Sequence, residues 1–425
     1  MNKRSLVWAD MLLLYRILFI FIVAIGAPFL LIKALAGGHG VKERLGFIPK
    51  RKSGGRLFWF HAASVGELKI LSSVIPKIRK NYQDIDFAVS TTTVTGKAKA
   101  IGILGDHAAV FLHPIELKSA IQRTIGRIEP EKLIVVETEI WPLALKVALD
   151  GGVKSFLING RMSAKSFRWY RTFRPLFSPI IGRFEKVIVQ TDGDARRYEQ
   201  LGAKRISIVG NIKYDQVLND GEIIIPEINF GKNENLKIVA GSLRKGEDDI
   251  LIELAGKSFD RDLPCQFIFV PRHMKDLEGL CNKLKEKSID YILWSEYRGE
   301  SVSDKMVLIV NTMGELPGFY SLADIAFVGG SLVPIGGHDP VEPASMGKAV
   351  VFGPYMDNAA EAASALLKSG GATEVKNSDQ ILDFLKTVCD DRKILIDKGE
   401  RCKNAVKSLS GASEKTVRLL MGEES

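Results

Sequence analysis

Short runs of apolar, β-branched and aromatic residues alternate along most of the chain with segments whose apolar residues recur every three or four positions. The short runs predict strands, and the longer segments predict helices. Regular alternation of the two is typical of a parallel sheet with helices on both faces. The expected strands of the first half are residues 57–60, 87–93, 109–112, 132–137, 154–158, 186–190 and 206–210.

The pattern breaks in a polar stretch around residues 219–235 and then restarts. The expected strands of the second half are residues 236–242, 267–272, 291–294, 307–311, 325–331 and 349–354. The fold class predicted is therefore α/β, with two Rossmann-like domains joined near residue 225. We expect an N-terminal domain at residues 36–222 and a C-terminal domain, with further helices at its end, at residues 223–425.

The segment Met11–Ile32 is 22 residues long and carries Arg16 as its single charge, which predicts a transmembrane anchor helix within residues 1–35. A cleaved signal peptide is the alternative, since Ala34-Leu35-Ala36 resembles a cleavage site. Basic residues are more frequent after the segment than before it. The positive-inside rule therefore predicts that the body of the protein lies on the cytoplasmic side.

Charge adds a preference for anionic partners. The chain has 59 Lys and Arg against 50 Asp and Glu, a net charge of +9, which suits phosphate esters, acidic lipid or nucleic acid. Residues 161–186 interleave basic with aromatic side chains, as expected for a surface that meets an anionic lipid headgroup and its acyl chains. The alternative is a solvated face whose aromatic residues belong to the core. No base-reading motif is found, so nucleic acid is not an expected partner.

In open α/β sheets, ligands bind beyond the carboxyl ends of the strands. Ser64 and Glu67 follow the first strand, where they match a helix capping box, so Glu67 has both a structural and a chemical interpretation. Glu137 and Glu139 follow the fourth strand. Strand alternation would point both carboxylates to the same face, where one could have a raised pKa.

Strands of the second half end in glycine-rich or polar loops at residues 271–273, 311–315, 329–331 and 336–343. Glycine lets backbone N–H groups approach a phosphate, and a helix that begins after the loop favours negative charge. Glutamate accepts hydrogen bonds from ribose hydroxyls, and arginine neutralises phosphate. Each loop is a weak signal, and His338 also fits a purely structural role. Together the loops predict a nucleotide site.

The strings FHAASVGE, VETEIWP, NGRMSAKS, GNIKYD, PRH, MGEL, FVGGSLV and GGHDPVEPA occur in this order. With them the chain resembles the 3-deoxy-D-manno-octulosonic acid (Kdo) transferases of lipopolysaccharide assembly, over nearly its whole length. The resemblance implies a GT-B fold, in which two Rossmann-like domains face a cleft. It also implies transfer of Kdo, with inversion, from CMP-Kdo to the glucosamine disaccharide of a lipid A precursor (lipid IVA). The reaction would take place at the cytoplasmic face of the inner membrane, on an anionic membrane surface, without a metal or other cofactor.

The resemblance also implies roles for individual residues. Glu67 would be the general base, and Glu137 and Lys213 would stabilise the transition state; a solvated lysine is the alternative for Lys213. The CMP-Kdo site would comprise Pro271, Arg272, His273, Met313, Gly314, Glu315, Gly330, Ser331, Gly337, His338, Asp339, Pro340, Val341, Glu342 and Asn358. The acceptor site would comprise Ser64, Gly66, Arg161, Ser163 and Arg168.

Some positions depart from the family pattern. Asp339 stands where Asn is usual, which changes a possible donor into an acceptor near the nucleotide. Two other functions remain open on sequence grounds. A GT-B-like nucleotide-sugar isomerase would need neither anchor nor basic aromatic surface, and a non-catalytic membrane-bound nucleotide-sugar binder would not need Glu67, Glu137 and Lys213 together.

Overall fold

The computed structural model describes residues 8, 10–21, 25–26, 40–52, 54–217, 223–232 and 234–423. The chain forms two compact units. Unit 1 contains residues 1–216 and 410–425, and unit 2 contains residues 217–409. Each unit is described by itself below.

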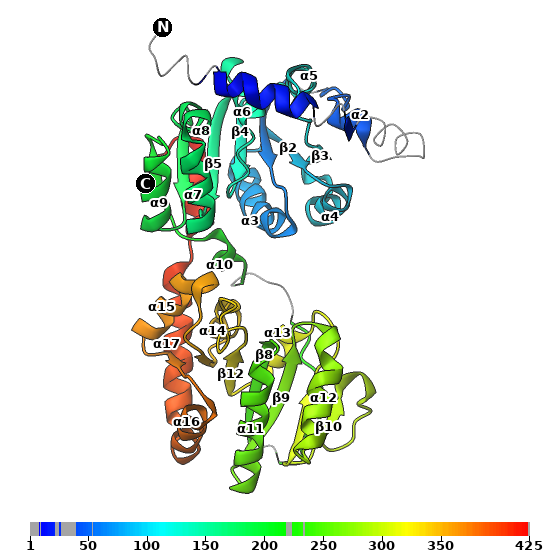
Figure 1. The fold of residues 1–425 in the computed structure, drawn as a ribbon, viewed down its shortest axis with the longest axis vertical. Helices are drawn as coiled ribbons and strands as arrows, with labels where there is room; N and C mark the ends of the chain where they lie inside the picture. Colours follow the sequence, from blue (N-terminus) through cyan, green and yellow to red (C-terminus); the bar gives the residue numbers. More distant parts are fainter. Residues whose placement is uncertain are drawn as a thin grey trace. The chain divides into compact units, whose positions relative to one another are not determined.

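The described part of unit 1 contains a seven-stranded parallel sheet with the strand order β3-β2-β1-β4-β5-β6-β7 (Figure 1). Its strands are β1 (Arg56–His61), β2 (Ile85–Thr91), β3 (Ala109–Leu112), β4 (Lys132–Val136), β5 (Lys154–Gly160), β6 (Lys186–Val189) and β7 (Ile206–Ile208). Its helices are α2 (Val41–Arg44), α3 (Val65–Asn81), α4 (Val94–Leu104), η1 (Gly105–His107), α5 (Lys118–Ile128), α6 (Pro142–Asp150), α7 (Ala164–Thr172), α8 (Arg174–Ile181), α9 (Asp192–Gln200), α10 (Ile212–Val217) and α18 (Ala412–Met421).

The described part of unit 2 also contains a seven-stranded parallel sheet, in the order β10-β11-β9-β8-β12-β13-β14. Its strands are β8 (Leu236–Leu243), β9 (Cys265–Pro271), β10 (Asp290–Leu293), β11 (Met306–Ile309), β12 (Ile325–Val328), β13 (Ala349–Phe352) and β14 (Ala372–Glu374). Its helices are α11 (Glu247–Asp260), η2 (Met274–Asp276), α12 (Leu277–Glu286), η3 (Trp294–Glu296), α13 (Leu316–Leu322), α14 (Val341–Ser345), η4 (Asp357–Ala359), α15 (Ala360–Lys368), α16 (Ser378–Asp390) and α17 (Lys393–Leu409).

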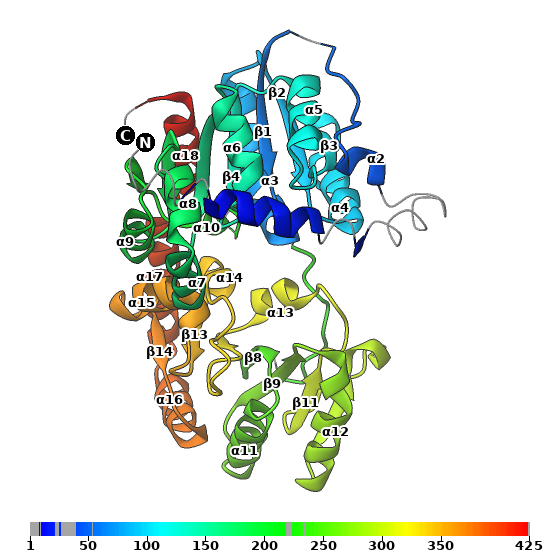
Figure 2. The ribbon, with the colours of Figure 1, turned by 45° about the horizontal axis from the view of Figure 1, so that its top comes forward.

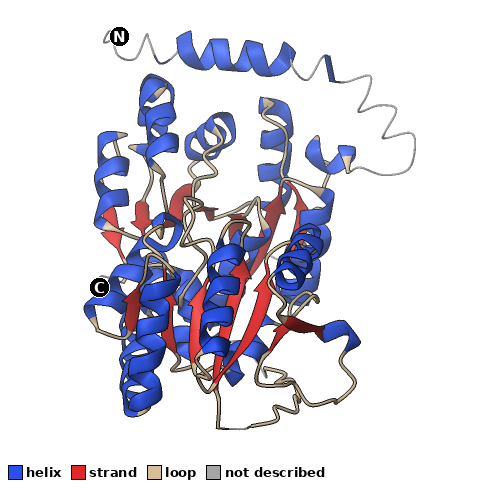
Figure 3. Ribbon diagram, turned by 60° about the horizontal axis from the view of Figure 1, so that its bottom comes forward, coloured by secondary structure: helices blue, strands red, loops and turns tan. Residues whose placement is uncertain are grey.

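Helices lie on both faces of each sheet, as the ribbon coloured by secondary structure shows (Figure 3), and the central strands are buried. In β1, Leu57 and Trp59 belong to one core cluster, and Phe58 and Phe60 belong to another. Consecutive side chains of a strand point to opposite faces, so a strand covered on both sides is apolar throughout. This explains why the apolar runs predict the strands well. Strand β14 contains Thr373 and Glu374, so it gives no apolar run and is not predicted.

The predicted anchor, Met11–Ile32, lies partly outside the described residues, since its residues 22–24 and 27–32 are not among them. Residues 10–21 are helical and lie along unit 1 beside α6 (Figure 2). Leu12 is buried there, and the Tyr15 hydroxyl donates to the Glu116 carboxylate over 2.9 Å. Within the part of the chain that is described, no helix is both long enough and apolar enough to cross a membrane.

The end of the chain differs from the expected domain boundary. Helix α18 belongs to unit 1 and packs on α3, whereas the boundary predicted from sequence assigns it to the C-terminal domain. The buried Lys132 donates to the carbonyl of Leu420 over 2.5 Å, so a cation lies at the carboxyl end of α18. The attraction is non-local, and for this reason the sequence pattern around residues 410–421 does not reveal it.

Candidate active site

Glu67 lies in the first turn of α3, directly after β1. Ser64 is the N-cap of this helix, and its hydroxyl oxygen accepts from the Glu67 N–H over 3.3 Å. The Glu67 carboxylate accepts from the Ser64 hydroxyl and from the Ala63 N–H, each over 2.7 Å. Ser64 therefore caps the helix as predicted, but the backbone donor to the Glu67 carboxylate is Ala63, whereas a standard capping box uses the N–H of the cap residue itself. Together these bonds hold the carboxylate in one orientation.

The same carboxyl group has an unusual protonation equilibrium. Burial raises the pKa of Glu67 from 4.5 to about 7, and this effect outweighs the hydrogen bonds from Ser64 and Ala63, which lower it. The charges of Glu139 and Glu137 add to the rise. A carboxyl group that titrates near neutral pH is suited to accept a proton from a substrate hydroxyl.

Glu137 and Lys213 form an ion pair in the same unit. The Lys213 ammonium, on α10, lies 2.7 Å from Glu137 Oε1, just beyond the end of β4. The Lys213 ammonium also lies beside Gly66, where an added Cβ would be 3.7 Å from Nζ. The structure therefore brings together all three residues to which the resemblance assigns catalytic roles.

The expectation that Glu137 and Glu139 share a face does not follow from strand alternation, because β4 ends at Val136. Glu137 has a φ of 57°, in the left-handed region, so regular alternation stops there. Burial raises the pKa of Glu139, although the hydrogen bond from Trp141 Nε1, 3.2 Å long, opposes this rise. A raised pKa is thus found at Glu139, as predicted for one of the pair. Its main cause is burial of the carboxyl group, and strand alternation plays no part.

The predicted acceptor-binding residues lie close to these groups or on the neighbouring helix. Ser64 and Gly66 belong to the Glu67 loop, and the backbone carbonyl of Arg161 accepts from the Thr138 hydroxyl. Ser163 caps α7, where its hydroxyl oxygen accepts from the Ser166 N–H over 3.1 Å. Arg168 is exposed on α7.

An apolar pocket of about 440 Å³ opens between the N-terminal helical residues and α6–α8. It is lined by Met11, Leu14, Tyr15, Leu18, Thr138, Glu139, Ile140, Trp141, Pro142, Trp169, Tyr170, Phe173, Leu176 and Phe177. Of the aromatic residues in the basic stretch, Tyr170 and Phe177 are buried and belong to the core. Trp169 and Phe173 are exposed by 52% and 39%, so these two side chains do not belong to the core.

In unit 2, the predicted donor-binding residues follow β9, β11 and β12 or lie at the start of α14 and in η4. Beyond β12, however, three backbone N–H groups are already engaged. Those of Gly330, Ser331 and Leu332 donate to the fully buried carboxylate of Glu247 over 2.6–2.8 Å. Glu247 thus fixes the shape of this loop and occupies the N–H groups that the glycine-rich sequence offers to a phosphate.

The loop before α14 is folded against the same region. The Gly337 and His338 N–H groups donate to the carbonyls of Gly330 and Gly329 over 2.7 and 3.0 Å. Gly336 has a φ of 101°, and a Cβ there would lie 2.5 Å from the Asn358 side chain, so glycine is required. Burial, together with the charges of nearby arginines, lowers the pKa of His338 to about 4, which keeps this imidazole neutral.

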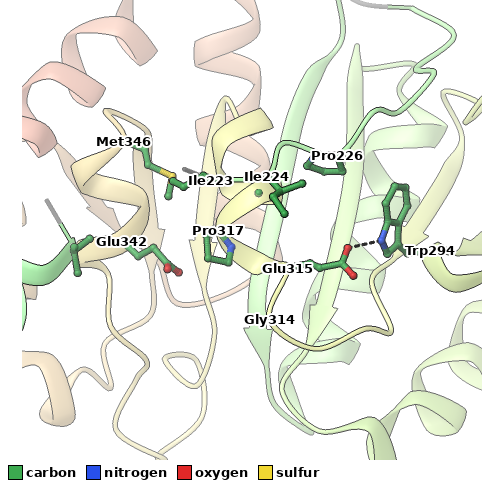
Figure 4. Close-up of a pocket in the computed structure, with 11 residues that line it drawn as sticks. Ile223, Ile224, Pro226, Trp294, Gly314, Glu315, Pro317, Glu342 and Met346 are labelled. Atoms are coloured by element: carbon green, nitrogen blue, oxygen red, sulfur yellow. Dashed lines mark hydrogen bonds between the residues drawn. The ribbon is translucent and has the colours of Figure 1, made fainter. Parts of the chain in front are cut away.

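A pocket of about 620 Å³ lies within unit 2, beside two of the predicted donor-binding segments (Figure 4). Its lining includes Gly314, Glu315 and Glu342 together with apolar side chains such as Ile224. The Trp294 indole N–H donates to Glu315 Oε2 over 2.6 Å (Figure 4). The lining thus offers carboxylate acceptors, which suit hydroxyl and amine groups better than phosphate.

Comparison with known proteins identifies the family. A family model described as 3-deoxy-D-manno-octulosonic-acid transferase (kdotransferase) matches residues 39–216. A 3-deoxy-D-manno-octulosonic acid transferase of Chlamydophila psittaci is 30% identical over 407 residues, which are 91% of each chain. The chain belongs to the Kdo transferase family.

Other relatives share parts of the molecule. A bifunctional glycosyltransferase/methyltransferase of Fusobacterium nucleatum is 30% identical over 79% of this chain, and the chain spans about half (53%) of that protein. A crystal structure of a putative UDP-N-acetylglucosamine 2-epimerase from Listeria monocytogenes has a TM-score of 0.59 at 12% identity. It covers 87% of this chain and 98% of its own, and at this identity it shows a common GT-B-like fold alone.

In this Kdo transferase family member, Asp339 makes one backbone contact that is open to aspartate and asparagine alike. Asp339 Oδ1 accepts from the Val341 N–H over 3.0 Å, a contact that an asparagine oxygen also makes. Glu247 and Trp294 contact residues of the candidate donor site, and sequence reasoning misses both. Glu247 carries a weak signal, an acid in the first turn of a helix after a glycine, whereas Trp294 carries none, since only the fold brings it to Glu315.

Proposed function

We propose that the protein transfers Kdo from CMP-Kdo to the glucosamine disaccharide of a lipid A precursor and releases CMP. Family membership supports the transfer of Kdo. The observation that carries the proposed chemistry is the arrangement of Glu67, whose pKa is about 7, close to the Glu137–Lys213 ion pair. These groups supply a base and a paired cation within one unit.

In the proposed reaction, the ionised Glu67 takes the proton of an acceptor hydroxyl as that oxygen attacks the anomeric carbon of Kdo. The new C–O bond forms on the face opposite the phosphate, so the configuration is inverted. The bond between the anomeric carbon and the phosphate oxygen breaks, and its electron pair leaves with CMP. Lys213 stabilises negative charge that develops in the transition state, and Glu137 orients its ammonium group.

Unit 2 binds the donor in this proposal. The carboxylates of Glu315 and Glu342 accept from donor groups of the nucleoside, and Arg272 neutralises phosphate. No metal is assigned a role, and metal independence is part of the proposal. Within the described ranges there is no group of three or more His, Cys, Asp or Glu side chains that could hold a metal ion.

The acceptor part of the proposal rests on unit 1. The apolar pocket beside Glu139 has a volume of about 440 Å³ and suits acyl chains, and the exposed Arg168 suits an anionic headgroup. Exposed apolar side chains of the N-terminal helical residues, including Leu14 and Phe21, support the further proposal of a site at the cytoplasmic face of the inner membrane.

The test is mass spectrometry of the lipid products after incubation of detergent-solubilised protein with CMP-Kdo and tetraacyl disaccharide bisphosphate, with EDTA present. The proposal expects a mass gain of one or more Kdo units, with release of CMP. Glu67→Gln should abolish the gain while CMP binding persists, and the exposed variant Glu199→Gln on α9 should react like the wild type. No gain from folded, CMP-binding protein would contradict the proposal and favour an isomerase or a non-catalytic binder.

A further inference from the structure

Asp215 joins two helices that are far apart in the sequence. It lies on α10, is 4% exposed, and its carboxylate accepts from the N–H groups of Gly411 and Ser413 over 2.5 and 2.6 Å. The Ser413 hydroxyl donates to the same carboxylate. Gly411 and Ser413 begin α18, so Asp215 caps the amino-terminal end of that helix.

These hydrogen bonds lie where the chain changes units. Unit 1 ends at Gln216, one residue after Asp215, and resumes at Ser410, one residue before Gly411. Within unit 1, the Asp215 carboxylate therefore links the segment that ends at residue 216 to the segment that begins at residue 410. The two segments are almost 200 residues apart, with a separation of 196 between Asp215 and Gly411.

Lys213 lies two residues before Asp215 on the same short helix. Helix α10 has six residues, and a helix of this length depends on tertiary contacts rather than on its own hydrogen bonds. At its beginning, the Ile212 N–H donates to Asn159 Oδ1 over 2.9 Å. The bonds of Asp215 to α18 hold the next turn. The direction in which Lys213 leaves α10, towards Glu137, depends on both attachments.

We propose that Asp215 is a positioning residue, which uses α18 as a support to hold the Lys213 ammonium against Glu137. The role of Lys213 in transfer belongs to the function proposed above, but the positioning itself is a property of the ion pair. Helix α18 has a second attachment, the hydrogen bond from Lys132 to the Leu420 carbonyl, at its other end. That attachment does not involve α10, so it provides a matched control.

The experiment compares Asp215→Asn with Lys132→Met in the full-length protein. An amide cannot accept from all the donors that the carboxylate satisfies, so Asp215→Asn loosens α10 from α18. Lys132→Met removes the attachment at the carboxyl end of α18 and leaves the hydrogen bonds between Asp215 and the start of that helix in place. Methionine also keeps an apolar stem beside Phe58. The rate of acetylation of Lys213, measured by peptide mass spectrometry, reports how firmly its side chain is held, because an amine that donates to Glu137 Oε1 over 2.7 Å is less available to the reagent.

We expect faster acetylation of Lys213 in Asp215→Asn and an unchanged rate in Lys132→Met. Turnover should fall about 10-fold in Asp215→Asn, with the KM for CMP-Kdo unchanged, because a misplaced group lowers the rate of the chemical step. Ser413→Ala removes one donor and keeps the fold, and it should shift acetylation in the same direction by less. Equal acetylation in Asp215→Asn and Lys132→Met, or no change in either Asp215→Asn or Ser413→Ala, would overturn the proposal. Acetylation is measured without a transferase assay, so this result is independent of whether Kdo is transferred.

Discussion

The Lys213 ammonium lies 2.7 Å from Glu137 Oε1, and Glu137 itself adopts a left-handed backbone conformation with a φ of 57°. Such a conformation is unfavourable for glutamate and persists where the surroundings enforce it. Here the Glu137 N–H donates to the Ile158 carbonyl over 2.9 Å, and the Tyr198 hydroxyl donates to the Glu137 carbonyl over 3.3 Å. The fold thus holds Glu137 in an unfavourable backbone conformation, and in this conformation its carboxylate contacts Lys213. Backbone strain of this kind is common at functional sites.

Substitution of Lys213 tests the value of this ion pair. Lys213→Met should lower turnover by about 100-fold or more, the usual loss when one preorganised charge or donor is removed from a transition state. CMP binding should change little, because Lys213 belongs to unit 1. The measurement is steady-state kinetics with CMP-Kdo, and Lys99→Met, an exposed change on α4, serves as the control. Turnover by Lys213→Met near the wild-type value would remove the lysine from the mechanism.

The raised pKa of Glu67 predicts the pH dependence of the reaction. A general base acts in its ionised form, so kcat/KM should rise with pH up to about 7 and level off above it. The rise should be about tenfold per pH unit well below the pKa. A profile without a break near neutral pH would contradict this assignment.

The same raised pKa makes the folded protein less stable as the pH rises, whereas kcat/KM is expected to increase. The folded protein binds the Glu67 proton more tightly than the unfolded chain, whose carboxyl has a pKa near 4.5. The contribution of this group to stability is therefore complete below pH 4.5 and is lost as the pH rises to about 7. Glu67→Gln removes this contribution, so the loss of stability between pH 5 and pH 8, measured by denaturant unfolding, should be smaller in the variant than in the wild type.

Removal of the Trp294 indole N–H should weaken the binding of CMP measurably. Trp294→Phe retains an aromatic ring against Tyr297 and Phe319 but removes the N–H that donates to Glu315. The loss of one hydrogen bond is worth about 1 kcal/mol, so CMP binding should weaken about fivefold. Isothermal titration with CMP measures this, with Trp169→Phe in unit 1 as the control. Unchanged affinity in Trp294→Phe would show that Glu315 does not need its indole partner.

The sequence predicts those features of the fold that depend on local pattern. The central strands are buried on both faces, so they are continuous apolar runs, and the spacing of Ser64 and Glu67 predicts the cap of α3. Features that depend on partners far apart in the sequence cannot be predicted from local pattern. Asp215 accepts a hydrogen bond from Gly411, 196 residues away, and Glu247 accepts one from Gly330, 83 residues away. No local sequence pattern indicates either pairing.

Substitution of Glu247 tests whether the loop at residues 330–332 needs the buried carboxylate to hold its shape. In Glu247→Gln, one of the two acceptor oxygens becomes an NH₂ group, which would face N–H donors of Gly330, Ser331 or Leu332 and leave them unsatisfied. Unsatisfied buried donors cost about 1–3 kcal/mol, so amide protons of this loop should exchange faster with solvent by roughly one to two orders of magnitude. Hydrogen-exchange mass spectrometry of the full chain measures the loop directly.

The loop effect should extend to the ligand. CMP should bind more weakly to Glu247→Gln, because Gly330 and Gly329 also support the loop of Gly337 and His338 through two backbone hydrogen bonds. Ser258→Ala provides a comparison, since it removes a buried hydroxyl of α11 that bonds within its own helix, to the Leu254 carbonyl, and does not contact the loop. Its exchange at residues 330–332 should match the wild type. If Glu247→Gln also matched the wild type in exchange and in CMP affinity, the loop would hold its shape without the carboxylate, and its contacts with the segment 336–338 would be sufficient.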